Sequence, residues 1–313
     1  MELQIFSGSA NEPLAKQIAD SLSMSLGDVE FTRFPDGELL VKYTQNIRGS
    51  DVFIVQPTCS PPAENMMQLL VMLDAARRAS AQRVTAVLPF YGYARQDRKD
   101  QPRVPITAKL AANLLVTAGA DRVLTVDLHS QQVQGFFDIP VDHLYAAPVL
   151  MQYLNGIIGK DSVVVAPDSG GVKMAHSYST AMETGLAIVA KRRVSAEEVS
   201  TMHLVGDVEG RDCVLVDDVV TTAGTLCGAA EKLREAGAER IFAAVSHCNI
   251  TEKGNKRLQE SSITQLVTSD SVPCEYAEGN DQIKVLSVAG LLAEAIRRIH
   301  ENQSVSSLFR MSK

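Results

Sequence analysis

A chain of 313 residues is long enough for two domains or one large one, and its 45% apolar and 21% charged residues are typical of a globular protein. The net charge of −7 argues against a nucleic-acid-binding protein, although a small anionic ligand could still occupy a local basic pocket. No apolar run approaches the about 18 residues that a membrane-spanning helix needs, so no membrane partner is expected.

Residues 1–16 carry a short strand pattern and a polar turn, which is not the pattern of a signal peptide. Further along, short β-branched apolar runs alternate with longer amphipathic stretches. The predicted strands are 52–56, 84–88, 123–126, 163–166, 187–190, 214–216 and 241–245, and the predicted helices include 63–79, 107–117 and 225–235. This alternation predicts the α/β class, with parallel sheets covered by helices.

Residues 114–129 and 232–247 resemble each other, with six identical pairs at a constant offset of 118 (232 minus 114). In each copy a helix ends at a glycine, Gly119 or Gly237, and a strand follows. Chance similarity of two helix-to-strand turns is one explanation, and a duplication is the other. A duplication predicts two similar halves, an N-terminal domain at 1–146 and a C-terminal domain with a short tail at 147–313. No Pro/Ser-rich linker marks the boundary, so we expect the two halves to pack closely.

The stretch VLVDDVVTTAGT (214–225) places two acids, Asp217 and Asp218, and a small hydroxyl-rich turn at the end of a buried strand. Ligands of open parallel sheets bind at this edge, and the helix that follows the turn offers backbone N–H groups to an anion. Phosphate beside acids that can accept from hydroxyls indicates a sugar phosphate. A capped helix with solvated acids is the alternative.

Five further motifs occur in register with this stretch: FPDGE (34–38), PFYGYARQDRK (89–99), DLHSQQVQGFF (127–137), PDSGG (167–171) and AKRR (190–193). Together they resemble the class I ribose-phosphate diphosphokinases of the phosphoribosyltransferase superfamily, over nearly the whole chain. The resemblance implies two phosphoribosyltransferase-like domains, each a largely parallel sheet flanked by helices. It also implies transfer of the diphosphoryl group of Mg-ATP to the 1-hydroxyl of ribose 5-phosphate, giving 5-phosphoribosyl 1-diphosphate and AMP for nucleotide biosynthesis.

The resemblance also assigns roles to individual residues. Lys191 and Arg193 are the catalytic residues, on a loop that closes over the reacting groups, and His129 and Asp168 belong to the Mg²⁺ site. ATP is bound by Asp36, Gly37, Glu38, Arg95 and Gln96, the 36–38 loop reaching the site of a neighbouring subunit. Ribose 5-phosphate is bound by Arg193, Asp217, Asp218, Thr221, Thr222, Ala223, Gly224 and Thr225.

The phosphate loop departs from the family pattern at two positions. Close relatives usually have Asp-Thr-Gly-Gly-Thr, so Thr221 replaces an acid and Ala223 a glycine. The length is unchanged, so the loop can still form. The alanine suggests that no positive φ is needed at position 223. We expect an active enzyme whose affinity for ribose 5-phosphate can differ from that of its relatives.

The family further implies a homo-oligomer, a hexamer built from dimers, activated by phosphate and inhibited by ADP near Ser306 and residues 99–103. Two alternatives stay open: an ordinary phosphoribosyltransferase, and a non-catalytic regulatory paralogue. The ATP motifs argue against the first. The second is favoured only by Thr221.

The cysteines are odd in number and scattered, and none forms a CxxC pair. They lie at positions 59, 213, 227, 248 and 274. This distribution predicts buried thiols in a reducing cytoplasm and no disulfide framework or zinc site.

Overall fold

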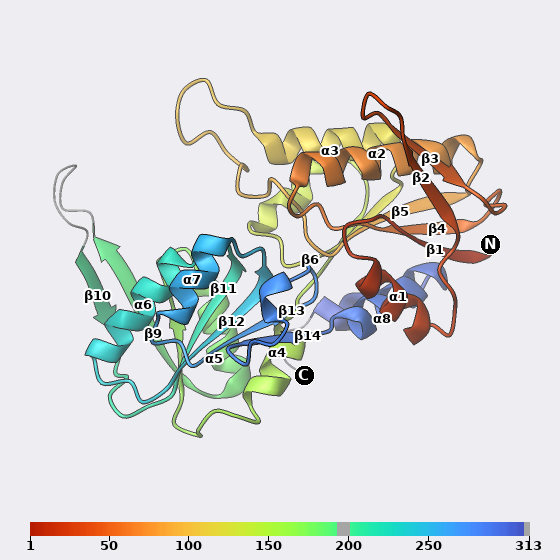
Figure 1. Ribbon diagram of the computed structural model, residues 1–313. Helices are drawn as coiled ribbons and strands as arrows, with labels where there is room; N and C mark the ends of the chain where they lie inside the picture. Colours follow the sequence, from red (N-terminus) through yellow and green to blue (C-terminus); the bar gives the residue numbers. More distant parts are fainter. Residues whose placement is uncertain (193–200, 310–313) are drawn as a thin grey trace. The chain divides into compact units, whose positions relative to one another are not determined.

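The computed structural model describes residues 1–192 and 201–309, which form two compact units (Figure 1). The first unit contains residues 1–145 and 287–309, and the second contains residues 146–286. The predicted N-terminal domain, 1–146, ends one residue after the first boundary between the two units. The predicted C-terminal domain, 147–313, differs from the second unit because residues 287–309 belong to the first.

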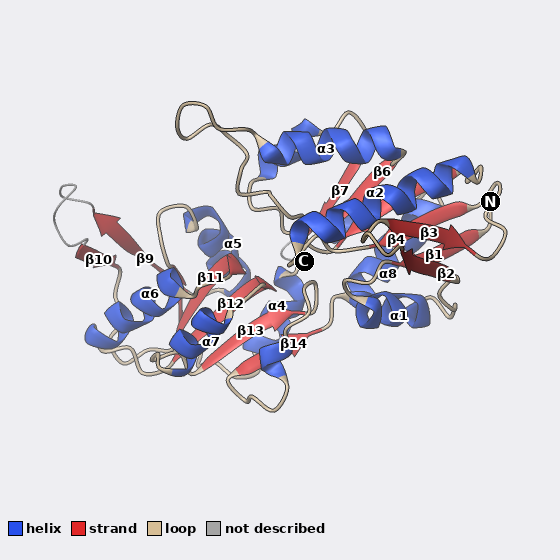
Figure 2. Cartoon of the chain, turned by 45° about the horizontal axis from the view of Figure 1, so that its top comes forward, coloured by secondary structure: helices blue, strands red, loops and turns tan. Residues whose placement is uncertain are grey.

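The first unit is built on a five-stranded parallel sheet with helices on both faces (Figure 2). Its strand order is β1 (Leu3–Ser7), β4 (Asp51–Val55), β5 (Arg83–Leu88), β6 (Arg122–Val126) and β7 (Val141–Leu144). Helices α2 (Pro62–Arg78) and α3 (Thr107–Ala118) cover one face, and α1 (Glu12–Ser21) and α8 (Ala289–His300) cover the other. An antiparallel hairpin, β2 (Val29–Arg33) and β3 (Leu39–Tyr43), packs on α2, and the short 3₁₀ helices are η1 (Gln131–Phe136) and η3 (Ser306–Phe309).

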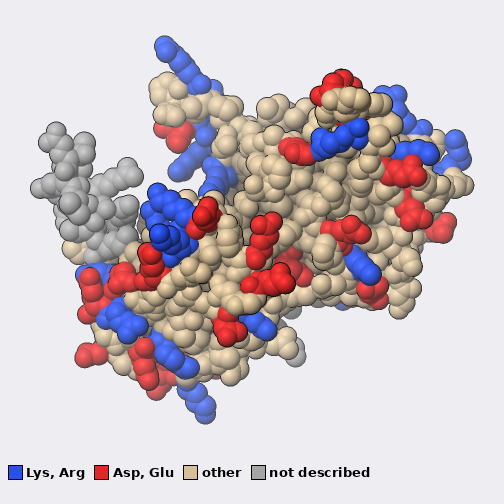
Figure 3. Space-filling model, viewed as in Figure 1, with Lys and Arg blue, Asp and Glu red and all other residues tan. Residues whose placement is uncertain are grey.

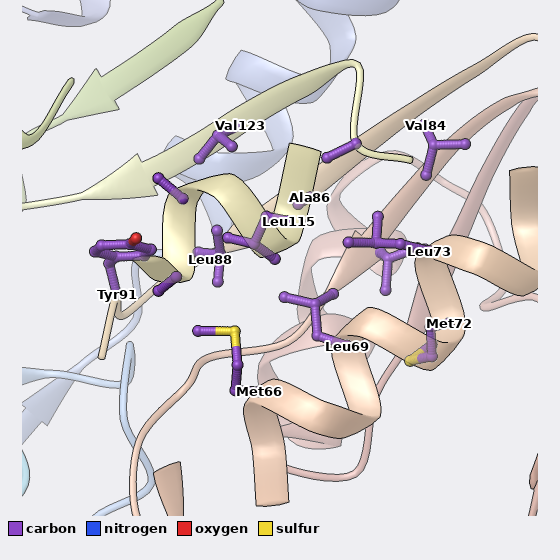
Figure 4. Close-up of a cluster of buried hydrophobic side chains, with 14 of the residues drawn as sticks. Met66, Leu69, Met72, Leu73, Val84, Ala86, Leu88, Tyr91, Leu115 and Val123 are labelled. Atoms are coloured by element: carbon purple, nitrogen blue, oxygen red, sulfur yellow. The ribbon is translucent and has the colours of Figure 1, made fainter. Parts of the chain in front are cut away.

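The core of the first unit lies between α2, α3 and the sheet (Figure 4). Leu69 and Leu73 recur at helical spacing on α2 and face Ala86 and Leu88 of β5, with Leu115 of α3 beside them. All five side chains are fully buried. Burial of each leucine contributes about 2 kcal/mol, and this apolar stripe fixes α2 against the sheet.

The second unit contains a seven-stranded sheet, parallel except for β10 at one edge. Its strand order is β10 (Thr201–Val205), β9 (Gly185–Arg192), β8 (Val163–Ala166), β11 (Cys213–Val220), β12 (Ile241–Cys248), β13 (Gln265–Ser269) and β14 (Ile283–Leu286). Helices α6 (Gly224–Glu235) and α7 (Glu252–Gln259) cover one face, α4 (Ala147–Leu154) and α5 (Val172–Met182) cover the other, and η2 (Glu275–Ala277) is a 3₁₀ turn. All residues of β12 are buried, as expected for a strand covered on both faces.

The two repeat segments occupy matching places in the two sheets. Strands β6 and β12 each follow a glycine, Gly119 or Gly237, that ends the preceding helix with φ of 121° or 86°. The order β4-β5-β6-β7 corresponds to β8-β11-β12-β13. The next strand outward differs, because β1 precedes β4 in the chain whereas β9 follows β8. The matched architecture therefore covers four strands of each unit.

The predicted α/β class, with largely parallel sheets flanked by helices, is confirmed. Each predicted strand and helix is present, and most bounds agree within two residues. The exceptions are β11 and β12, which extend further, so Asp217 and Asp218 lie within β11 and not after it. The prediction omitted several elements: β2, β3, β7, β10, β13, β14, α1, α4, α5, α7 and α8.

Helix α8 joins the first unit through an apolar stripe and a buried ion pair. Its buried residues recur at helical spacing, and the helix packs against α1. At its C-terminal end, Arg83 of β5 donates from Nε to Asp51 Oδ1 at 2.7 Å and from Nη2 to the Ile299 carbonyl at 3.0 Å. His300 Nδ1 lies 2.8 Å from Asp51 Oδ2. Asp51 is fully buried, so the negative charge of its carboxylate must be compensated by these partners.

We expect Arg83→Ala to destabilise the protein by about 3 kcal/mol, because it leaves the buried Asp51 carboxylate without its main cation. Chemical denaturation measured on the full chain tests this value. The control is Arg78→Ala, which removes a solvent-exposed partner of Asp74 and should change stability little. Equal effects of the two substitutions would contradict this account of how α8 is held.

Candidate functional site

Three carboxylates lie at the carboxyl-terminal edge of β8 and β11, which are neighbouring parallel strands. Asp168 follows β8, and Asp217 and Asp218 lie near the end of β11. Burial raises the pKa of Asp217 to about 8, and repulsion from Asp218 and, more weakly, Asp168 adds to the shift. The Asp218 N–H donates to Asp217 Oδ1 at 2.9 Å. The edge therefore concentrates acidic groups, and hydroxyl donors or a cation would stabilise their ionised forms.

Asp168 is oriented by the glycines that follow it. Its Oδ1 accepts from the N–H groups of Gly170 at 2.8 Å and Gly171 at 3.1 Å. No group of three or more His, Cys, Asp or Glu side chains in residues 1–192 and 201–309 is arranged to hold a metal ion. Mg²⁺ does not need such a group, since it commonly binds one or two carboxylates together with substrate phosphates and water. The clustered carboxylates fit this donor chemistry.

The turn between β11 and α6 leaves a helix N-terminus open to a ligand. Helix α6 begins at Gly224 without a side-chain cap, and Thr222, Gly224 and Thr225 are exposed. The first N–H groups of a helix lack intrahelical partners, and the helix dipole favours an anion there. The turn therefore has the features of a phosphate site, next to the clustered carboxylates of the same strand.

The expectation that position 223 needs no positive φ was wrong. Ala223 adopts the left-handed conformation, with φ of 53° and ψ of 9°, as the N-cap residue of α6. The strand must turn sharply into the helix at this point, and an L-residue in this region costs about 1–2 kcal/mol. The Ala223 methyl group is buried in the core under α6, which offsets roughly 0.8 kcal/mol of that cost.

Helix α7 holds this turn in place through residues that the sequence did not reveal. The N–H and hydroxyl groups of Thr251 donate to the Thr221 carbonyl at 3.0 and 3.3 Å. Arg257 Nη1 donates to the Thr222 carbonyl at 3.1 Å. A Cβ atom at Gly254 would lie 2.2 Å from the Thr221 oxygen, so only glycine allows this approach. Thr251 is also the N-cap of α7, a signal that could have located the helix.

In the first unit, the segments after β5 and β6 share one sheet edge, because these strands are parallel neighbours. Arg95 is exposed on the first segment. Gln96, on the same segment, contacts the first residues of α3: its carbonyl accepts from the Ala108 N–H at 3.1 Å, and its Oε1 accepts from the Thr107 hydroxyl at 2.6 Å. The predicted residues Arg95 and Gln96 therefore lie at the same edge as His129.

His129 is exposed in the turn after β6. The turn is constrained by Asp127, which has φ of 36°, and by His143 of β7, whose Nε2 accepts from the Leu128 N–H at 2.9 Å. His143 is buried and was not singled out from the sequence. It fixes the backbone next to His129, as a supporting residue does for a site on a loop.

Residues Asp36, Gly37 and Glu38 form the tip of the β2–β3 hairpin, which is a sheet separate from the central one. All three are exposed, and Gly37 has φ of 93°. The Glu38 N–H donates to Asp36 Oδ1 at 3.2 Å. This turn is thus held by its own contacts, and its outer face is free for a ligand or a second subunit to contact.

Lys191 belongs to β9, where its backbone pairs with Met202 of β10. Arg193 lies outside the described residues. Among the helices that the structure describes, none is long and apolar enough to cross a membrane.

A doubly wound α/β protein with an acidic strand edge beside an open helix N-terminus has the architecture of a sugar-phosphate-binding enzyme. Two family models match the chain: the N-terminal domain of ribose phosphate pyrophosphokinase over residues 3–119, and the phosphoribosyl synthetase-associated domain over residues 192–310.

Curated relatives match over almost the whole length. The ribose-phosphate pyrophosphokinase of Vibrio vulnificus is 49% identical over 311 residues, covering 98% of this chain and 99% of the relative, and that of Pasteurella multocida is 48% identical over the same shares. The crystal structure of phosphoribosylpyrophosphate synthetase from Mycobacterium smegmatis matches with a TM-score of 0.91 and 40% identity, covering 96% of this chain and all of that one. The chain belongs to the ribose-phosphate pyrophosphokinase family and is an enzyme, as predicted.

The raised pKa of Asp217 predicts a pH-dependent effect of Asp217→Asn. The folded protein keeps this proton up to about pH 8, whereas the unfolded chain loses it near pH 4, so ionisation of Asp217 lowers stability as the pH rises between these values. The asparagine side chain has no carboxyl proton to lose in this pH range. We therefore expect the variant to gain thermal stability over the wild type, by a few degrees, on going from about pH 5 to about pH 8.

Thermal unfolding of the ligand-free protein across this pH range measures the difference. Asp281→Asn, at an exposed aspartate of the same unit, is the control and should show no such trend. A stability difference for Asp217→Asn that does not change with pH would contradict the assignment.

Proposed function

We propose that the enzyme transfers the diphosphoryl group of Mg-ATP to the 1-hydroxyl of ribose 5-phosphate, producing 5-phosphoribosyl 1-diphosphate and AMP. The observation that carries the proposal is the open N-terminus of α6 beside the acids of β11. The sugar 1-hydroxyl attacks the β-phosphorus roughly in line. The protein groups mainly position the reactants and stabilise charge, and no protein nucleophile takes part.

The ribose 5-phosphate site is proposed on the second unit. The 5-phosphate would be bound by backbone N–H groups and hydroxyls of residues 221–225, at the positive end of the α6 dipole. Asp217 and Asp218 would accept from the 2- and 3-hydroxyls. Asp217 would ionise when these donors replace water, because hydrogen bonds to the charged form lower a carboxyl pKa. Thr251 and Arg257 support this site by fixing the loop carbonyls.

The ATP side is proposed on the first unit. Arg95 presents a guanidinium that suits a polyphosphate, and the Gln96 amide nitrogen can donate while its oxygen stays bonded to Thr107. Asp36 and Glu38 would accept from the adenine amine. The exposure of their hairpin supports a contribution to the site of a neighbouring subunit.

Mg²⁺ would neutralise charge on the ATP phosphates. Asp168 offers a carboxylate that is already oriented by Gly170 and Gly171, which suits this ion. His129 is the second proposed ligand, and its nitrogen is less typical for Mg²⁺. Lys191 and Arg193 are proposed to stabilise the migrating diphosphoryl group and its leaving group, and Arg193 also to contact the sugar phosphate.

The assembly and its regulation remain part of the proposal. We infer a homo-oligomer, a hexamer built from dimers, with phosphate as activator and ADP as inhibitor near Ser306 and residues 99–103. A cytoplasmic location is supported by the cysteines, all of which are free thiols.

On the face shown in Figure 3, basic and acidic side chains are interspersed, which does not favour a nucleic acid as partner.

The proposed reaction predicts AMP as the nucleotide product. Purified full-length protein is incubated with ATP, Mg²⁺ and phosphate, with and without ribose 5-phosphate, and the nucleotides are separated. We expect AMP that depends on the sugar phosphate. Sugar-dependent ADP would instead indicate ordinary phosphoryl transfer. An absence of turnover in an assembled, phosphate-replete sample would overturn the proposal and favour a regulatory paralogue.

A further inference from the structure

Two cysteines that are distant in the sequence meet beside the phosphate loop. Cys248 is the last residue of β12, and Cys274 immediately precedes η2. Their Sγ atoms are 3.4 Å apart and share a hydrogen bond. Cys248 is 1% exposed, whereas Cys274 is half-buried. The sequence had indicated scattered thiols, so this contact is a property of the fold.

The environments of the two thiols differ in a way that gives them different reactivity. A hydrogen bond from Cys248, with further ones from the N–H groups of Tyr276 and Ala277, lowers the pKa of Cys274. The same contact and burial raise the pKa of Cys248 well above its usual range. The more acidic thiol is also the more accessible one, and the thiolate is the reactive form.

We propose that Cys248 and Cys274 form a redox site that is oxidised reversibly to an intrachain disulfide. A hydroperoxide is the oxidant. The Cys274 thiolate attacks its outer oxygen and the O–O bond breaks, which leaves Cys274 as the sulfenic acid; the departing alkoxide or hydroxide takes up the proton that the Cys274 thiol released, and leaves as an alcohol or water. The Cys248 sulfur then attacks this sulfur, the S–O bond breaks, and the Cys248 proton leaves with the hydroxyl group as water. An external dithiol reverses the reaction by exchange.

A zinc site is a less well supported interpretation of this pair of cysteines. A structural zinc ion needs four ligands, and the described part of the chain contains no group of three or more potential ligands. The other thiols offer a contrast, because burial raises the pKa of Cys59 to about 11 and that of Cys213 to about 12. Those two cysteines should therefore react more slowly than Cys274.

The disulfide should also act on the neighbouring loop, a consequence that rests on the proposed function. A disulfide bond is about 2.05 Å long, so the two sulfur atoms must approach by about 1.4 Å. Cys248 pairs with Val220, the residue before Thr221, and three residues later Thr251 binds the Thr221 carbonyl. Movement of the end of β12 thus reaches the turn that would hold the phosphate, and we expect weaker binding of ribose 5-phosphate.

The site is tested by titrating the reduced full-length enzyme with hydrogen peroxide and mapping its peptides by mass spectrometry. We expect one disulfide between Cys248 and Cys274, a fall in free thiols from five to three, and full recovery with dithiothreitol. Cys274→Ser should abolish the disulfide, and Cys213→Ser should leave it intact. Oxidation of Cys248 and Cys274 to separate sulfinic acids, or no preference over Cys59 and Cys213, would overturn the proposal.

A second probe uses the unaltered chain, so its result does not depend on whether the serine variants fold. Phenylarsine oxide binds paired thiols, so it should protect Cys248 and Cys274 from alkylation in the unaltered chain. Alkylation of both thiols in its presence would also overturn the proposal.

The effect on the loop is measured separately, as the KM for ribose 5-phosphate before and after oxidation. We expect a rise of about tenfold in the wild type and none in Cys274→Ser. A disulfide with unchanged KM would overturn the coupling alone. If the reduced enzyme shows no ribose-dependent turnover, the proposed function is overturned. The disulfide assay would still show whether Cys248 and Cys274 form a redox site.

Discussion

The pairing of β8 with β11 at the centre of the second sheet is the constraint on which the candidate site of this enzyme depends. It brings Asp168, Asp217 and Asp218 to one edge, where burial and mutual repulsion keep Asp217 protonated up to about pH 8. Such a cluster is unfavourable in the absence of a ligand. It becomes favourable once hydroxyl donors and a cation occupy the edge, so part of the stability lost there returns on binding. This energetic argument supports the proposed role of the acids as a binding surface over the alternative of helix caps.

The turn between β11 and α6, the proposed phosphate loop, depends on a second constraint, which is the packing of α7 against its carbonyl groups. Thr251 binds Thr221, and Gly254 allows α7 to approach it closely. These contacts hold Ala223 in a conformation that alanine does not favour. The first unit follows the same plan, since His143 fixes the turn that carries His129. In both units a parallel sheet sets the position of the site, and neighbouring elements set the shape of the loops.

Hydrophobic pattern and turn chemistry were sufficient to predict the α/β class, the central strands and the strand edge that carries Asp217 and Asp218. Helix α7 was missed because it is short and strongly polar, and strands β13 and β14 were missed because their apolar runs are brief. The left-handed backbone at Ala223 could not be inferred, because its cost is offset by burial that only the fold reveals. The contact between Cys248 and Cys274 likewise depends on tertiary packing, since 26 residues separate them.

The central claim is that Asp217 and Asp218 bind the sugar hydroxyls of ribose 5-phosphate. The most direct measurement compares the affinities of ribose 5-phosphate and its 2-deoxy analogue for the wild type and for the double variant Asp217→Asn, Asp218→Asn. The account predicts that loss of the 2-hydroxyl weakens binding to the wild type about tenfold or more, the scale of a hydrogen bond to a charged group, and has little effect in the variant. The same loss of affinity in both proteins would contradict it.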